Sequence, residues 1–499
     1  MVKGEVTLRN RRQGSPAWLT DAAIYQIYPR SFQDSDGDGI GDLEGVRQRL
    51  PYVRSLGFDG IWLSPIYPSP LADGGYDISD HSAVDPVLGT LESFDALLAE
   101  ARANKLKVLL DLVPSHTSIE HAWFRDHPEW YVWADGGPPN NWLSAFGGPA
   151  WSKDEPSGRW YLHSFYREQP DLNWRHPEVQ EAVGQVMAFW LARGVDGFRV
   201  DAVDRLAKDP SLRDDHPATG PWLLPLPPEY ATLSHVHSRD ADDVDELVGV
   251  LRRRAGDAAL IGEVYRPTEE LERFVNHFDL VFAFEFMFAS WHPEAIARVV
   301  EPAVRLGQIA WVLSNHDFSR LASRLGEDNL RLAAALLLTL PGAAFVFQGD
   351  ELGLRDGPGV HPPFDRAGRD GSRHPMQWDA TPTGGFSSAR PWLPLVDPEH
   401  RNVETAEEDP SSLLTLYRSL LSLRRCFGTG FEVLLVDSTV LAYRRGQHVV
   451  TLNFGDEPRQ AVGEGAVVLN TDPGQHFRIA PARGAAVLYA ESSRSSCLR

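Results

Sequence analysis

The chain has 499 residues, of which 42% are hydrophobic and 23% charged, and its formal net charge is −21 at pH 7. This length and apolar content are enough to bury a large core in more than one domain. The strong negative charge argues against nucleic acids and anionic membrane surfaces as partners.

No segment predicts secretion or membrane insertion. Residues 1–13 are basic but are not followed by the apolar run of a signal peptide, and the longest apolar stretch, residues 333–340, is too short to span a bilayer. The two cysteines, Cys426 and Cys497, form no disulfide framework. We therefore expect a cytoplasmic protein, without predicting an oligomeric state.

A first strand is predicted at residues 22–28, and an acidic, glycine-rich loop follows it. Aspartates at every second position of such a loop can wrap oxygen ligands round a hard cation. The twelfth residue of the loop is Gly45, where an EF-hand needs Glu, so the pattern predicts a small structural Ca²⁺ site of another kind, with Mg²⁺ or a solvated acidic turn as the alternatives. The predicted ligands are Asp34, Asp36, Asp38, Asp42 and the carbonyl of Ile40.

Seven further strand-like segments follow, with helix-like segments between them. They lie at residues 60–63, 107–113, 194–200, 259–263, 280–284, 309–314 and 343–347. Eight strands that alternate with helices are typical of a (β/α)₈ TIM barrel, and so of the α/β class.

Two regions depart from this alternation. Residues 114–174 are rich in Trp, Gly, Pro and His with weak periodicity, which indicates a subdomain inserted after the third strand rather than a loose loop. Short alternating runs near the end of the chain predict a C-terminal antiparallel β domain. The predicted domains are the barrel at 1–113 and 175–427, the inserted subdomain at 114–174, and a C-terminal β-sandwich at 428–499.

Polar side chains gather where the predicted strands end. Taken alone, each of them is most simply structural, and the Arg199-x-Asp201 pair could be a plain buried ion pair. Together they converge on one cavity, because the carboxyl ends of all barrel strands meet at the same face. The clustered residues are His116 after the third strand, Arg199 and Asp201 at the fourth, Glu263 at the fifth, and His316 and Asp317 at the seventh.

These residues lie in five ordered motifs that resemble the α-amylase family of glycoside hydrolases, and within it the α-glucosidase and oligo-1,6-glucosidase branch. The motifs are DLVPSHTS at 111–118, GFRVDAV at 197–203, IGEV at 261–264, SNHD at 314–317 and GRDGSRHPMQW at 368–378. The resemblance runs from about residue 22 into the C-terminal domain. It implies the same barrel, inserted subdomain and C-terminal β domain.

The resemblance implies the chemistry of a retaining glycosidase. Asp201 would be the nucleophile that forms a glucosyl-enzyme, Glu263 the acid/base, and Asp317 a residue that binds and distorts the sugar. The two reacting carboxyl groups should lie roughly 5–5.5 Å apart. Burial and nearby carboxylates should raise the pKa of Glu263, whereas Arg199 should keep Asp201 ionised.

Further sugar contacts are implied by the same resemblance. Tyr76 would stack on the glucose and Asp73 would bind its non-reducing end, while His116 and His316 would donate hydrogen bonds to sugar hydroxyls. Other pocket positions match Phe146, Phe165, Gln169 and either Arg369 or Arg373.

Two positions depart from the family pattern. Ser115 stands where the family usually has Asn, so the calcium that this Asn binds in the amylases is not expected here. His374 replaces the usual Thr, which should alter the entrance to the acceptor site.

The predicted function is that of an exo-acting α-glucosidase with transglucosylation. Its substrates would be small maltose-like α-glucosides with an α-1,4 linkage, and it would need no organic cofactor. The preference for α-1,4 rests on Ala202, because the residue after the nucleophile tends to be Val in α-1,6-specific relatives.

Several alternatives remain. Within the family they are an oligo-1,6-glucosidase and a glucosyl isomerase or transferase of the trehalose synthase or sucrose isomerase type. From other classes they are a transporter subunit or scaffold and a calcium-binding structural protein. The three acids and the lack of a transmembrane segment argue against a transporter subunit or scaffold, and only the loop at 34–42 supports the calcium-binding protein.

Overall fold

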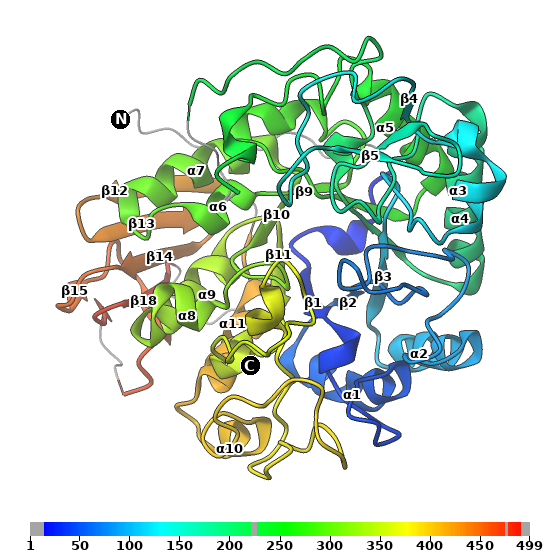
Figure 1. The fold of residues 1–499 in the computed structure, drawn as a ribbon. Helices are drawn as coiled ribbons and strands as arrows, with labels where there is room; N and C mark the ends of the chain where they lie inside the picture. The colour runs from blue at the N-terminus through cyan, green and yellow to red at the C-terminus, as the bar shows by residue number, and fades with distance from the viewer. Residues whose placement is uncertain (1–13, 221–226, 429, 475–477, 491–499) are drawn as a thin grey trace.

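Eight parallel strands close into a barrel in the order β1-β11-β10-β9-β8-β7-β3-β2, which confirms the predicted fold (Figure 1). The computed structural model describes residues 14–220, 227–428, 430–474 and 478–490, so Cys497 and the ends of the predicted outer domains lie outside it. The barrel strands are β1 (Ala23–Ile27), β2 (Gly60–Leu63), β3 (Lys107–Leu112), β7 (Gly197–Val200), β8 (Ala259–Gly262), β9 (Leu280–Phe282), β10 (Ile309–Val312) and β11 (Ala343–Phe347).

Helices surround the barrel, and local signals in the sequence set their ends. Asp42 caps the start of α1 by accepting a hydrogen bond from the amide of Gly45. Proline occupies the first position of α4 and α7, where no amide hydrogen is needed. The helices are α1 (Leu43–Leu56), α2 (Leu91–Ala103), α4 (Pro177–Arg193), α5 (Val244–Ala255), α6 (Phe284–Phe288), α7 (Pro293–Leu306), α8 (Leu321–Leu325), α9 (Leu330–Thr339), α10 (Val403–Glu408) and α11 (Leu413–Arg424).

The apolar run at residues 333–340 lies mostly in α9, which is buried between the barrel and the C-terminal sheet. Among the described residues, no helix is long and apolar enough to cross a membrane.

Successive side chains of β7 point alternately to the hydrophobic core and to the inside of the barrel. Phe198 and Val200 belong to the core shared with the surrounding helices. Arg199 points into the barrel, with its guanidinium 5.0 Å from the centre of the Trp62 ring, which is part of the inner core. This side-chain period of two places the charged residue at the barrel axis.

Six of the eight predicted strands were longer than the observed ones, and two of them ran into a helix end. Gly194 belongs to the end of α4, not to the strand, because its φ of 105° makes it the left-handed cap that terminates that helix. The strand predicted at 280–284 ends at Phe282, and Phe284 already begins α6.

The segment between β3 and α4 forms a small unit of its own. It contains α3 (Ala122–Asp126) and a three-stranded antiparallel sheet in the order β4-β6-β5, with β4 at Trp133–Ala134, β5 at Trp151–Lys153 and β6 at Trp160–Leu162. Trp142 and Trp151 pack in its separate core. We call this unit the inserted subdomain; its exact boundaries stay a prediction.

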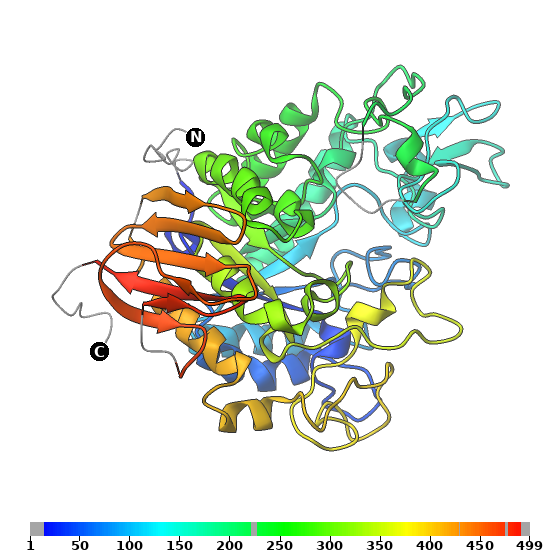
Figure 2. The same cartoon turned by 90° about the vertical axis from the view of Figure 1, so that its left-hand side faces the viewer.

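The chain ends in a five-stranded antiparallel sheet, which lies on the opposite side of the barrel from the inserted subdomain (Figure 2). Its order is β12 (Phe431–Val436), β13 (Val440–Arg445), β14 (His448–Asn453), β18 (Gly484–Tyr489) and β16 (Ala466–Asn470), and a two-stranded ribbon joins β15 (Arg459–Gln460) to β17 (Ile479–Ala480). The sheet packs against α7 and α9.

Candidate active site

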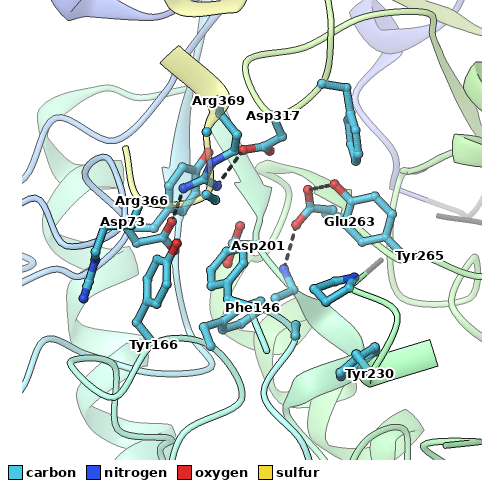
Figure 3. Close-up of a pocket in the computed structure, with 18 of the residues that line it drawn as sticks. Asp73, Phe146, Tyr166, Asp201, Tyr230, Glu263, Tyr265, Asp317, Arg366 and Arg369 are labelled. Carbon is cyan, nitrogen blue, oxygen red and sulfur yellow. Dashed lines mark hydrogen bonds and ion pairs between the residues drawn. The ribbon is translucent and has the colours of Figure 1, made fainter. Parts of the chain in front are cut away.

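A cavity of about 700 Å³ lies at the carboxyl ends of the barrel strands (Figure 3). Asp201 follows β7, Glu263 follows β8 and Asp317 lies beyond β10, and all three line the cavity. The inserted subdomain contributes Phe146 and Phe165 to the lining. The barrel therefore brings together the three acids that lie far apart in the sequence.

Arg199 binds three carboxylates at the base of the cavity. Its Nη1 donates to Asp111 at 2.6 Å and to Asp201 at 2.7 Å, and its Nη2 donates to Glu263. Its side chain is only 1% exposed. One buried guanidinium thus holds the two reacting carboxyl groups of the predicted mechanism next to each other.

Asp111 is a functional residue that the sequence reasoning missed. It is the second-last residue of β3 and pairs in register with Arg199 of β7. Trp62 and the hydroxyl of Tyr76 donate to its other oxygen, at 3.1 and 3.0 Å. Burial raises the pKa of Asp111 to about 6, although the positive charge of Arg199 acts to lower it. Its place at the start of the DLVPSHTS motif was the only sequence signal.

Asp201 is buried beside other ionisable groups. Burial raises the pKa of Asp201, the charge of Glu263 raises it further, and Arg199 only partly opposes them. Arg199 opposes this rise, as the sequence predicts, but its guanidinium is shared among three acids.

Glu263 receives two more hydrogen bonds. The amide of Ala202 donates to its Oε2 and the hydroxyl of Tyr265 to its Oε1, both at 3.0 Å. Ala202 adopts a left-handed conformation with φ of 43°, and this turn directs its amide towards the carboxylate. Tyr265 was not predicted as a site residue.

Asp317 is held ionised. Its Oδ1 accepts from Arg369 at 3.1 Å and from Arg373 at 3.4 Å, and the ring of His316 lies 3.5 Å from its Oδ2. Burial alone would raise the pKa of Asp317, but these three neighbours outweigh it and hold the pKa well below its usual range.

The structure distinguishes the two candidate arginines. Arg369 lines the cavity, where it also pairs with Asp73. Arg373 is 1% exposed, lies behind the lining and donates to the carbonyl of His316. Arg369 is therefore the arginine that faces the cavity.

Tyr76 and His316 form a parallel stack with ring centres 5.4 Å apart and a 2.8 Å contact between the Tyr76 hydroxyl and Nε2. Tyr76 lines the cavity, whereas His316 is fully buried behind it and also contacts Gln26. Burial lowers the pKa of His316 to about 3, so the ring is neutral. The structure thus places His316 as a support for Tyr76 rather than at the cavity surface.

His116 lines the cavity, but Gln169 does not. Gln169 is fully buried and donates to Asp73 at 2.8 Å, with its Nε2 3.0 Å from the ring of His116. Gln169 therefore orients Asp73. His374 is also buried, bonded to the carbonyl of Pro394 and absent from the lining, so the structure does not support its predicted effect on the acceptor entrance.

One side of the cavity was missed altogether. The segment after β7 supplies two interacting pairs of side chains to the lining. Arg205 donates to the Tyr230 hydroxyl at 2.6 Å, and Arg239 forms an ion pair with Asp204 at 2.8 Å. No motif marks this segment, so the sequence held no signal for it beyond its closeness to Asp201.

The acidic loop brings three of its four aspartates together. Carboxylate oxygens of Asp34, Asp36 and Asp42 lie within 4.8 Å of one another. Asp38 is exposed and outside this group, and its carboxylate accepts from the amide of Ile40 at 2.7 Å. Gly39 has a φ of 91°, and a Cβ there would clash with the carbonyl of Arg390. The loop therefore packs closely against the segment that contains Arg390.

Known proteins are similar to this chain in sequence and in architecture. Residues 26–427 match the alpha amylase catalytic domain. A probable alpha-glucosidase of Rhizobium meliloti (strain 1021) is 42% identical over 458 residues, 82% of each chain, and an oligo-1,6-glucosidase of Halalkalibacterium halodurans is 34% identical over 88% of this chain and 90% of its own. The crystal structure of an alpha-glucosyl transfer enzyme, XgtA, is 35% identical with a TM-score of 0.86, covering 94% of this chain and 99% of its own.

Proposed function

The chain belongs to the alpha-amylase family of glycoside hydrolases, and we propose that it is a retaining, exo-acting α-glucosidase that releases glucose from the non-reducing end of short α-1,4-linked gluco-oligosaccharides. Relatives named alpha-glucosidase, maltase and oligo-1,6-glucosidase support this activity class.

The observation that carries the proposal is that Arg199 binds Asp201 and Glu263 at the same time. A single guanidinium bridging both acids favours the short carboxyl separation of a retaining enzyme, because an inverting enzyme needs room for a water between them. Asp317 stays ionised beside Arg369, where it can accept hydrogen bonds from sugar hydroxyls.

The reaction then has two steps, which require Glu263 protonated and Asp201 ionised at the start. Glu263 gives its proton to the glycosidic oxygen while the Asp201 carboxylate bonds to the anomeric carbon, and the aglycone leaves as an alcohol. Glu263, now a carboxylate, takes a proton from water, whose oxygen replaces Asp201 at the anomeric carbon. The inversions at each step cancel, so the product keeps the α configuration.

Transglucosylation follows from the same intermediate, since an acceptor hydroxyl can replace water in the second step. The likeness to an enzyme named for alpha-glucosyl transfer supports this activity and keeps a glucosyl transferase or isomerase as the second candidate.

Product analysis on maltose, isomaltose, sucrose and trehalose tests the proposal. We expect maltose to be cleaved fastest. With an aryl α-glucoside, which releases a single glucose, we expect the first glucose to be the α anomer by NMR. Initial release of β-glucose would overturn the retaining assignment. Conversion of a disaccharide mainly into an isomer would establish the second candidate instead.

We also propose that the loop at 34–42 holds one Ca²⁺, or Mg²⁺ in its place. Asp34, Asp36 and Asp42 offer converging carboxylate oxygens, the ligand type that hard cations prefer. Asp34 and Asp42 are buried, and burial raises the pKa of Asp42 against the hydrogen bonds from Ser35 and Gly45, a cost that a bound cation would remove. None of these residues lines the cavity, so the ion would be structural.

A further inference from the structure

Four arginines and three acids form a charged cluster beside the cavity, in the segments that follow β7 and β8. The arginines are Arg205, Arg239, Arg266 and Arg273, and the acids are Asp204, Asp240 and Glu270. Arg239 binds Asp204 at 2.8 Å. Arg266 and Arg273 bind Asp240 at 3.1 and 3.2 Å. Glu270 lies 3.6 Å from Arg266, so the cluster carries one positive charge more than it carries negative charges.

Arg205 accounts for this extra charge. Among the described residues, only Asp204 forms an ion pair with it, at 3.9 Å from Nε, and that carboxylate is already bound by Arg239. The hydrogen bond that Arg205 donates goes to a neutral group, the Tyr230 hydroxyl. Arg205 is only 6% exposed, so bulk water solvates its charge poorly. A bound anion would compensate this charge.

Arg205 lies on the side of the cavity that would hold the aglycone. It lines the cavity, and it ends a short 3₁₀ turn that begins two residues after Asp201. Figure 3 shows its partner Tyr230 on the side of Asp201 that is away from Asp73. If Asp73 binds the non-reducing end of the glucose, as in the proposed function, the aglycone extends towards Tyr230 and Arg205.

We propose that Arg205 recognises a negatively charged group on the aglycone, so that the preferred substrates are α-glucosides with a carboxylate or a phosphate on the part that leaves. This inference rests on the proposed function and specifies its substrate class. A guanidinium binds either group through charge-assisted hydrogen bonds, which are about twice as strong as neutral ones. The cavity of about 700 Å³ has room for a glucose and a small acidic aglycone.

A positive charge at this position also opposes the field of the whole protein. The formal net charge of −21 repels anionic substrates, and a cation inside the cavity offsets this repulsion where the substrate binds. A neutral aglycone gains nothing from that charge, so the two substrate classes can be told apart by their dependence on Arg205.

Arg205→Met removes the charge and keeps an unbranched side chain that can pack against Phe165, whose ring centre lies 5.6 Å from the guanidinium. Arg205→Lys keeps the charge. Arg213→Met is the matched control, because Arg213 belongs to the same segment and pairs with Asp209 at 2.8 Å, but is 65% exposed and is not among the described residues that line the cavity.

The test compares two pairs of substrates that differ in charge. One pair is 4-carboxyphenyl and 4-carbamoylphenyl α-glucoside, and the other is maltose with a phosphate on O6 of its reducing glucose and maltose itself. Arg205→Met should lower the charged-to-neutral ratio of kcat/KM about tenfold or more relative to wild type in at least one pair. Arg205→Lys should lose less, and Arg213→Met should keep the wild-type ratio. The pair with the larger loss shows whether the anion is a carboxylate or a phosphate.

Comparing the ratio between proteins cancels the different reactivities of the leaving groups. A wild-type ratio retained by Arg205→Met in both pairs would overturn the inference, as would a wild type that prefers the neutral member of both pairs, a result that does not require the variant to fold. Failure of wild type to cleave any of the four substrates would instead overturn the proposed function. Melting temperatures show that each variant is folded.

Discussion

At the scale of single residues, the site depends on Arg199. Its guanidinium replaces the water that Asp111, Asp201 and Glu263 lost on burial, and without it three acids would remain uncompensated at the base of the cavity.

Asp201→Asn should abolish turnover and covalent labelling together. An amide is too weak a nucleophile to replace the carboxylate at the anomeric carbon, and the loss of one member of a catalytic unit costs about 10⁴- to 10⁶-fold in rate. The rate on maltose and mass spectrometry with a mechanism-based label measure both effects. Retention of more than about a hundredth of the wild-type rate in pure, folded protein would contradict the nucleophile assignment.

Ala202→Val should shift the preference from maltose towards isomaltose. Added methyl groups beside Asp201 and Glu263 change where the acceptor sugar can lie, which is worth about 1–3 kcal/mol, or roughly tenfold or more in the ratio of kcat/KM values. The φ of 43° also makes a β-branched residue costly here, so some stability should be lost.

Ala202→Gly is the control for this change, because it accepts the left-handed conformation freely and adds no bulk. It should keep the maltose preference. Faster cleavage of isomaltose than maltose by the wild type would show that Ala202 does not select the linkage.

At the scale of elements, the loop at 34–42 should bind its ion independently of the chemistry. Excess EDTA should lower the melting temperature and added Ca²⁺ should restore it, because a ligand at 100 times its Kd adds about 2.7 kcal/mol to the folded state. Activity in protein that stays folded should not change, since the loop does not line the cavity.

Single substitutions in the loop locate the ligands. Asp36→Ala should remove the effect of EDTA on the melting temperature, whereas Asp38→Ala should keep it, because Asp36 belongs to the converging group and Asp38 does not. An unchanged melting temperature in EDTA, together with no bound metal by elemental analysis, would refute the site.

A buried histidine pair at the start of α3 should make the protein sensitive to acid. His81 Nδ1 lies 3.2 Å from His121 Nε2, and His121 Nδ1 accepts from the amide of Trp123, so both rings are neutral. Burial lowers the pKa of His81 to about 3 and of His121 to about 4.

Since both pKa values are depressed in the folded state, the unfolded chain binds the extra protons as the pH falls below about 6.5. The free energy of unfolding should therefore drop by about 2 kcal/mol per histidine between pH 7 and pH 5. Urea unfolding of His121→Gln should show a drop that is smaller by about that amount. An unchanged drop would mean that this pair does not control the acid sensitivity.

At the scale of the whole molecule, a buried arginine links the C-terminal sheet to the barrel domain by hydrogen bonds and an ion pair. Arg445 of β13 donates to the carbonyls of Thr339 and Leu340 at the end of α9 and pairs with Asp21 at 2.8 Å. Its side chain is fully buried. It satisfies the carbonyl of Thr339 at the helix end and shares that of Leu340 with Arg424.

Arg445→Met should lower the free energy of unfolding by roughly 3 kcal/mol, because it leaves the Thr339 carbonyl without its donor and Asp21 without its arginine. Its neighbour Arg444 is the control: it is 51% exposed and pairs only with Glu432, so Arg444→Met should cost less than about 1 kcal/mol. Urea unfolding compares the two. Equal losses would contradict this role for Arg445.

The sequence by itself determined the barrel, the closing β domain and the three acids. Barrel strands and helices are read from local periodicity, and the carboxyl ends of parallel strands must meet at one face, so Asp201, Glu263 and Asp317 could be placed together without coordinates. Because this reading uses only local patterns, it misplaced strand ends. A helix cap such as Gly194 adjoins the next strand, and the composition does not change between them.

Only the tertiary structure decided the contacts between segments far apart in the chain. Arg369 and Arg373 belong to the same motif, and only their packing shows that one faces the cavity and the other supports His316. Arg366 and Glu168 are 198 residues apart and meet only because the inserted subdomain folds over the barrel. Such pairs depend on distance in space and on shared burial, which no local pattern of residues encodes.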